Sequence, residues 1–164
     1  MTDQPQDPTA PTAPGATTPV ATDVVRGAAR LLADMGYAVI PEFVLASGRR
    51  ADIAGVDGRG RVVLVEVKIS LGDFRGDAKW PDYLEFCDRF FFAVPPDFPR
   101  DAVEGPLAWP ERTGLIVADR FGGAIIRPAP EVLMHANRRR AETLRFALAA
   151  AGRLHRLSDP ERGL

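Results

Sequence analysis

The chain has 164 residues, which fits one domain of ordinary size and excludes two full domains. Its 21 basic and 22 acidic residues leave a net charge of −1, which excludes a globally basic nucleic-acid binder but not a local basic patch. The single cysteine, Cys87, excludes an intrachain disulfide framework and favours a reducing compartment. The chain has neither an apolar run of membrane-spanning length nor a signal-peptide pattern, so we expect a cytoplasmic protein that does not bind membranes.

Composition divides the chain into three parts. Residues 1–21 are rich in proline and threonine, with five prolines in the first twenty positions, and we predict a disordered tail there. Residues 22–157 carry the apolar patterns of one folded domain. Residues 158–164 are expected to fray.

The first half of the domain predicts one helix and three strands. The pair Thr22-Asp23 suits a helix N-cap, apolar residues follow at helical spacing, and Gly36 suits the helix end. Residues 37–45 read as a strand whose proline favours an edge or a bulge. Residues 51–56 and 61–69 read as a hairpin.

The second half predicts a crossover followed by a hairpin and a helix. Residues 74–87 are expected to be helical, with a restart at Trp80-Pro81, where the proline suits a first turn. The wholly apolar residues 89–94 predict a strand buried on both faces. A right-handed β-α-β crossover would connect the third strand to this one. Residues 95–113 are expected to form a long surface loop. The remaining predicted elements are strands 114–119 and 124–127 and a helix over 131–151. Together they predict an α/β fold with a central mixed β-sheet flanked by helices.

Three charged residues interrupt apolar strands: Asp52, Glu66 and Lys68. Side chains alternate between the faces of a strand, so Glu66 and Lys68 share one face. Whether Asp52 joins them depends on the hairpin register. A three-residue loop at 58–60, with a glycine in the left-handed conformation, would place Asp52 opposite Glu66, whereas a shift of one residue would turn Asp52 away.

Two facing carboxylates would suit a divalent cation. Carboxylates about 4 Å apart repel by roughly 4 kcal/mol, which a bound Mg²⁺ would offset. A metal-bound water can attack phosphorus, and Lys68 would orient it or stabilise charge on the phosphate. The competing interpretation is an exposed ion pair on an ordinary hairpin.

The segments that carry these three charged residues resemble a known protein family. Asp52 in GRRADIAG, a turn, and then Glu66-Val67-Lys68 are similar to the motif of the PD-(D/E)xK nuclease superfamily. The longer string GRRADIAG…VEVKIS…DFRGDAKWPDYLEFCDRFFFAV…GLIVAD resembles the MmcB family of bacterial DNA repair proteins over about residues 24–150. The resemblance implies a restriction-endonuclease-like core, a role in DNA repair and a divalent metal, Mg²⁺ with Mn²⁺ as a substitute.

The sequence departs from the superfamily pattern in two places. The proline that precedes the first carboxylate is Ala51 here. Many relatives carry a glutamate in the first helix as a further ligand, where this chain offers only Asp23 and Asp34. Glu42 could replace it, so we predict Asp52, Glu66 and Glu42 as metal ligands, with an ion pair from Glu42 to Arg49 or Arg50 as the alternative.

Basic and aromatic residues near the motif are candidates for contact with DNA. We expect Arg49, Arg50 and Lys79 to contact phosphates, and Tyr83 to stack on a base. The alternative for Tyr83 is packing between helix and sheet. Asp73 and Asp77 are expected to cap a helix or to pair with Arg75 and Lys79 rather than to bind metal. Arginines of the last helix would bind phosphate or line a solvated face.

These observations favour one function and leave two alternatives open. The first is metal-dependent hydrolysis of DNA that recognises structure rather than sequence, with Asp52, Glu66 and Lys68 as the catalytic residues. The second is a DNA-binding module of the same fold without efficient chemistry. The third is an interaction subunit that binds other repair proteins. The oligomeric state stays open, with a homodimer among the possibilities.

Overall fold

The computed structural model describes residues 20–159, so most of the predicted tail and the end of the chain lie outside the described residues. The fold begins one residue earlier than predicted, and its last helix runs through Ser158, where fraying was expected. The helices and strands, in chain order, are α1 (Ala21–Asp34), β1 (Ala38–Val44), β2 (Arg50–Val56), β3 (Val62–Val67), α2 (Leu71–Gly76), the 3₁₀ helix η1 (Trp80–Phe86), β4 (Arg89–Val94), α3 (Arg100–Glu104), the 3₁₀ helix η2 (Pro106–Ala108), β5 (Gly114–Ala118), β6 (Gly123–Arg127) and α4 (Ala136–Ser158).

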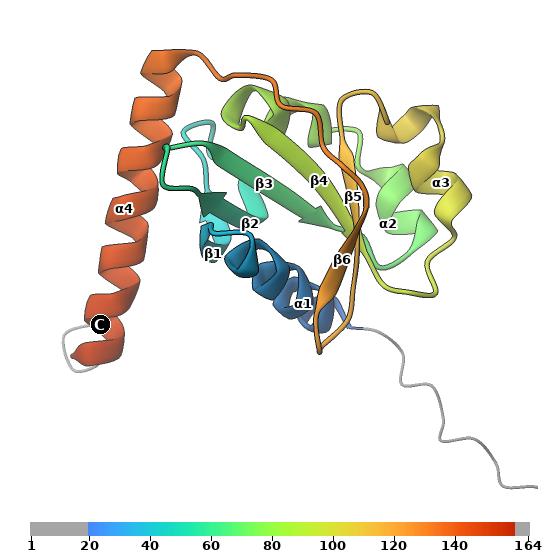
Figure 1. Cartoon of the computed structure of the whole chain (residues 1–164), viewed down its shortest axis with the longest axis horizontal. Helices are drawn as coiled ribbons and strands as arrows, with labels where there is room; N and C mark the ends of the chain where they lie inside the picture. The colour runs from blue at the N-terminus through green and yellow to red at the C-terminus, as the bar shows by residue number, and fades with distance from the viewer. Residues whose placement is uncertain (1–19, 160–164) are drawn as a thin grey trace, which may run out of the picture.

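The six strands form one sheet in the order of the chain, β1-β2-β3-β4-β5-β6 (Figure 1). Strands β3, β4 and β5 run parallel to one another, and the other neighbours pair antiparallel. The parallel step from β3 to β4 encloses α2 and η1, as the predicted crossover requires. The α/β class and the mixed sheet flanked by helices are therefore confirmed.

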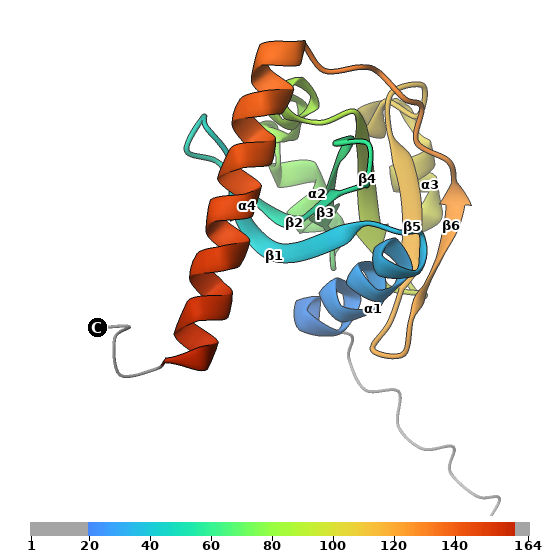
Figure 2. The same ribbon diagram turned by 60° about the vertical axis from the view of Figure 1, so that its left-hand side comes forward.

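Helices cover both faces of the sheet (Figure 2). Helix α1 packs on one face through Val24, Ala28 and Leu32, none of which is exposed. Gly27 allows a close approach, because a Cβ there would lie 2.0 Å from the carbonyl oxygen of Asp119. The candidate site lies on the opposite face, which is filled by the aromatic residues Phe74, Trp80, Tyr83, Phe90 and Phe92.

The turn between β2 and β3 has the predicted three-residue form. The amide of Asp57 donates to the carbonyl of Arg61 at 3.0 Å, and Gly60 has a φ of +75°, where a glycine is favoured. The register continues as Val56–Val62 and Ile53–Val65, which is the alternative that directs Asp52 and Glu66 to one face.

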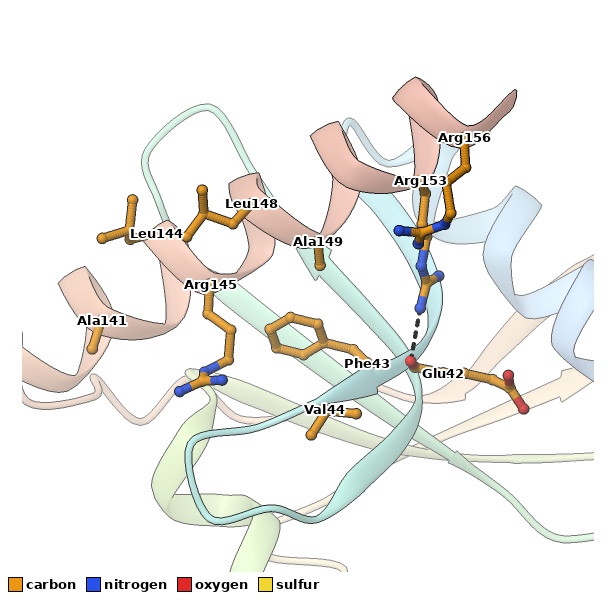
Figure 3. Close-up of a pocket in the computed structure, with 10 residues that line it drawn as sticks. All are labelled: Glu42, Phe43, Val44, Ala141, Leu144, Arg145, Leu148, Ala149, Arg153 and Arg156. Carbon is orange, nitrogen blue, oxygen red and sulfur yellow. Dashed lines mark hydrogen bonds between the residues drawn. The ribbon is translucent and has the colours of Figure 1, made fainter. Parts of the chain in front are cut away.

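Helix α4 lies beside the β1 edge and contacts the sheet through few side chains (Figure 3). The rings of Phe43 and Phe146 are 5.8 Å apart. Oε1 of Glu142 accepts a hydrogen bond of 3.1 Å from the amide of Ala46. Arg153 donates to the carbonyl of Glu42 at 2.8 Å. Ala149 and Ala150 of this helix also pack against the core.

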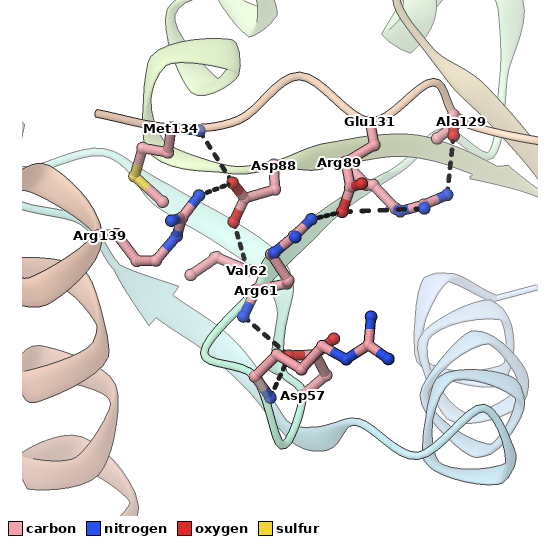
Figure 4. A network of polar contacts seen from close by, with 10 residues as sticks. Asp57, Arg61, Val62, Asp88, Arg89, Ala129, Glu131, Met134 and Arg139 are labelled. Carbon is pink, nitrogen blue, oxygen red and sulfur yellow. Dashed lines mark hydrogen bonds and ion pairs between the residues drawn. The ribbon is translucent and has the colours of Figure 1, made fainter. Parts of the chain in front are cut away.

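Asp88 connects the start of β3 to the segment that leads into α4 (Figure 4). Its side chain is buried and accepts 2.8 Å hydrogen bonds from the amides of Val62 and Met134, together with an ion pair from Arg139. Burial works to raise the pKa of Asp88, but the hydrogen bonds and the charge of Arg139 outweigh it and hold this pKa below its usual value.

Three predicted elements were wrong in extent. The helix expected over residues 74–87 begins earlier, at Leu71, because Ser70 caps it there, whereas the predicted restart at Trp80-Pro81 is confirmed as the start of the 3₁₀ helix η1. The expected open loop over 95–113 contains α3 and η2, which bury Val103 and Ala108. The last helix begins at Ala136, not near 131. Within residues 20–159, no helix is both long enough and apolar enough to cross a membrane.

Candidate active site

Asp52 and Glu66 belong to neighbouring strands of the same hairpin. The pairs Ala54–Leu64 and Ile53–Val65 place Asp52 opposite Glu66 at the next position along the ladder. Side chains at alternate positions share a face, so both carboxylates lie on the face that holds Ala54 and Leu64. The predicted convergence of the two acids is therefore present.

Asp52 is fixed by the backbone of the opposite strand. Its Oδ2 accepts a hydrogen bond of 2.7 Å from the amide of Val67. Burial raises the pKa of Asp52, and this hydrogen bond and the charge of Lys68 offset only part of that effect. One oxygen of this carboxyl group is therefore held in place by the backbone of β3.

Glu66 is the more perturbed of the two acids. Its side chain is 12% exposed, and its Oε1 lies 3.4 Å from Nζ of Lys68. Burial, followed by the charge of Asp52, raises the pKa of Glu66 to about 7. Its Oε2 is buried and has no hydrogen-bond partner within the described residues. A buried, unsatisfied carboxylate oxygen beside a second carboxylate is a fitting position for a hard divalent cation.

Lys68 is held by three carboxylates although it is only 3% exposed. Its Nζ lies 2.7 Å from Oδ2 of Asp77, 3.4 Å from Oε1 of Glu66 and 3.9 Å from Oδ1 of Asp73. Burial alone would lower the pKa of Lys68, but the hydrogen bond to Asp77 and the charges of Glu66 and Asp77 raise it instead. The ammonium group therefore stays charged at the edge of the acid pair.

Helix α2 brings the two further acids to Lys68. Ser70, not Asp73, is the N-cap of this helix: its hydroxyl accepts a hydrogen bond of 3.1 Å from the amide of Asp73, so the capping role expected of the Asp73 side chain was wrong. Asp77 ends the helix, and its Oδ1 accepts a hydrogen bond of 3.0 Å from the amide of Lys79.

The partner predicted for the side chain of Asp77 was wrong. Its ion pair is with Lys68, not with the side chain of Lys79, and this pair outweighs burial and lowers the pKa of Asp77. Strand periodicity cannot reveal such a contact, because it depends on where the crossover places the end of α2.

Glu42 does not join the acid pair. It lies opposite Asp52 in the pairing of β1 with β2, but its φ of +48° interrupts the ladder. Its exposed carboxylate lies 3.6 Å from Nη1 of Arg50, which is the ion-pair alternative. Across residues 20–159, no three His, Cys, Asp or Glu side chains form a metal-binding group, so the predicted set of three acidic ligands is absent.

The four residues predicted to contact DNA have different surroundings. Arg50 and Lys79 are exposed. Arg49 is half-buried and forms an ion pair with Asp82. Tyr83 is 7% exposed, stacks on Phe90 and donates a 2.8 Å hydrogen bond to the carbonyl of Arg50.

The expected stacking of Tyr83 on a base is therefore wrong, because its ring is already used in the core. Burial, together with the nearby charge of Glu66, raises the pKa of Tyr83 to about 12. The structure therefore has the alternative, in which Tyr83 packs between helix and sheet. Trp80 is also packed in the core, where it contacts Phe90, Phe92 and Trp109.

The model of a protein family described as "DNA repair protein MmcB-like" matches residues 8–161, nearly the whole chain. The chain belongs to the MmcB-like family. This membership confirms the family resemblance seen in the motif strands and makes the chain a member of a DNA repair protein family. No curated protein matches it significantly.

Two solved structures are similar to this MmcB-like chain. A protein of unknown function, SPO1766 from Silicibacter pomeroyi, is 40% identical, with a TM-score of 0.79 over 88% of this chain and 94% of that one. A repair endonuclease from Pyrococcus abyssi is 19% identical, with a TM-score of 0.35 over 55% of this chain and 45% of that one.

Proposed function

We propose that this protein hydrolyses phosphodiester bonds of DNA with the help of Mg²⁺, or of Mn²⁺ in its place. The observation that carries the proposal is the pair formed by Asp52 and Glu66, in which the buried Oε2 of Glu66 has no hydrogen-bond partner among the described residues. Membership of a DNA repair family supports DNA as the substrate.

Asp52 and Glu66 would hold the metal. The free Oε2 of Glu66 and the carboxylate of Asp52 are oxygen donors of the kind that hard cations prefer. When bound, the metal would supply a more acidic water and would polarise the phosphate. The raised pKa values of both acids fit this role, because a cation between them would favour the ionised forms that the protein alone disfavours.

Lys68 would act on the phosphate or on the attacking water. Its ammonium group is charged, nearly buried and fixed by Asp77, so it needs little reorganisation when charge develops on a phosphate oxygen. Its contact with Glu66 keeps it within reach of the metal ligands. Asp77 would act through Lys68 as a positioning residue.

Recognition would depend on phosphates rather than on base edges. Arg50 and Lys79 are exposed at the ends of elements next to the site, Arg50 at the start of β2 and Lys79 just before η1. With Tyr83 in the core, the aromatic ring that was predicted to stack on a base is not free to do so. Such contacts favour recognition of DNA structure over sequence.

Cleavage of branched, nicked and single-stranded DNA with Mg²⁺ or Mn²⁺ tests this function. The wild type should cut at least one of these substrates, and Asp52→Ala and Lys68→Ala should abolish cutting. Glu42→Gln is the matched control, since it removes an exposed acid of the neighbouring strand and should cut like the wild type. Equal background rates for the wild type and both site variants would contradict hydrolysis.

The same experiment tests a second candidate function, which is DNA binding through this fold without efficient hydrolysis. The observation in its favour is that, among the residues that the structure describes, only two acids come together where three were expected. In that case DNA binding would weaken with salt and survive Lys68→Ala, and neither metal would produce cleavage.

A further inference from the structure

Helix α4 carries an apolar face that nothing in the described chain covers. Its inner side packs on the domain through Phe146 and Glu142, which are buried. On the other side, Leu144, Leu148 and Leu154 are 61%, 66% and 65% exposed. Figure 3 shows Leu144 and Leu148 on the side of the helix that points away from Phe43.

The spacing of this face is that of a helix-packing seam. Leu144, Ala147, Ala151 and Leu154 alternate by three and four residues, as the a and d positions of a heptad do. Leu144 and Ala147 line a depression of about 590 Å³ on one side of this face, and Leu144 also borders the groove of about 640 Å³ between α4 and β1. A row of exposed apolar residues with a hollow beside it is suited to receive the side chains of another helix.

We propose that this seam binds α4 of a second copy of the chain, with the two helices antiparallel. The order Leu, Ala, Ala, Leu reads the same in both directions. In an antiparallel pair, Leu144 would face Leu154 of the second copy, and Ala147 would face Ala151 of the second copy. A two-fold interface requires such a self-complementary surface, and the small alanines at its centre let the helices approach closely.

The charges of α4 agree with a second copy. The four positions that flank the seam between Ala141 and Leu157 hold no Lys, Arg, Asp or Glu: they are Thr143, Leu148, Ala150 and His155. Arg145, Arg153 and Arg156 instead line the groove next to β1, on the side toward the helix's own domain. None of these four positions therefore carries a side chain that would select a foreign helix of opposite charge.

The one arginine in line with the seam has a complement in the second copy. Arg140 is exposed and lies one turn before Leu144. In the antiparallel pair it would lie against the end of the other helix near Ser158, where the last carbonyl groups carry the negative end of the helix dipole. In this arrangement, apolar side chains would meet at the centre of the interface, and Arg140 of each copy would lie near the C-terminal end of the other helix.

Sedimentation of the full chain over a range of concentrations tests this interface. The seam covers about three turns, which is short beside a standard interface of about 800 Å² per partner, so we expect a dimer with a dissociation constant in roughly the micromolar range. Leu144→Glu with Leu154→Glu should weaken dimerisation by roughly tenfold or more without unfolding an exposed face. Phe121→Glu, which changes a 79% exposed side chain in the β5–β6 turn, is the control and should dimerise normally.

Cysteine cross-linking tests the orientation of the helices. The native Cys87 is buried and burial raises the pKa of its thiol, so it should not interfere. Ala147→Cys mixed with Ala151→Cys should form a disulfide-linked dimer under mild oxidation, whereas neither variant should do so alone. Cross-linking of each variant alone would indicate parallel helices and overturn the arrangement. A chain that stays monomeric at all concentrations would overturn the interface itself. Binding of the leucine face to anionic vesicles by a chain that stays monomeric would overturn it as well.

Discussion

The ammonium group of Lys68 lies closer to Asp77 than to Glu66, with Nζ–O distances of 2.7 and 3.4 Å. The lysine of the candidate site is thus positioned by a residue at the end of α2, outside the hairpin that carries the motif. This contact makes the orientation of Lys68 a property of the crossover between β3 and β4.

Asp77→Asn should therefore slow cleavage more than it weakens DNA binding. With a neutral partner, Lys68 would turn toward Glu66, and a misplaced charge of this kind costs roughly 10- to 100-fold in rate. We expect a fall in kcat with a nearly unchanged KM. Asp73→Asn is the control, because its carboxylate lies 3.9 Å from Nζ and should matter less. Equal losses in both variants would show that Asp77 has no special role.

Asp52→Asn should stabilise the protein in the absence of metal. It removes the charge that faces Glu66, while the side-chain oxygen can still accept from the amide of Val67. We expect a gain of about 1 kcal/mol in the free energy of unfolding, which corresponds to roughly 2–4 °C in Tm. Mg²⁺ should raise the Tm of the wild type and not that of the variant. A surface ion pair would predict little change in either measurement.

The raised pKa of Glu66 predicts a dependence of stability on pH. Between its ordinary value of 4.5 and its folded value of about 7, the folded protein holds a proton that the unfolded chain has lost. The free energy of unfolding should therefore fall as the pH rises through this window, by about 3 kcal/mol at most, and the loss should be complete above it. Glu66→Gln should flatten this part of the curve measured by urea unfolding. A variant with the same slope as the wild type would show that Glu66 is ionised throughout.

Tyr83→Phe separates a structural role from contact with DNA. The variant loses the hydrogen bond to the carbonyl of Arg50, which should cost about 1 kcal/mol of stability. DNA affinity at low salt should stay unchanged, because the ring does not reach the surface. Lys79→Ala, by comparison, should weaken binding and reduce its salt dependence. A loss of affinity in Tyr83→Phe with normal stability would restore the stacking role.

The parts of the site that follow strand periodicity could be predicted from the sequence. The face shared by Glu66 and Lys68 follows from alternation, and the loop ending in Gly60 selected the register that brings Asp52 to them. The parts that depend on how helices lie on the sheet could not be predicted.

Asp77 reaches Lys68 because α2 ends at that point, and Tyr83 is buried because residues 80–86 form a 3₁₀ helix on the sheet. Glu42 turns aside because its positive φ interrupts β1, and a lone non-glycine residue in that conformation leaves no periodic signal in the sequence.

The location of a divalent cation tests the central claim most directly. Crystals of the protein soaked in Mn²⁺ should show anomalous density between the carboxylates of Asp52 and Glu66, next to Oε2 of Glu66, and Asp52→Asn crystals treated in the same way should not. Ordered wild-type crystals with no density at this position, after a soak that places Mn²⁺ elsewhere on the protein, would contradict the account.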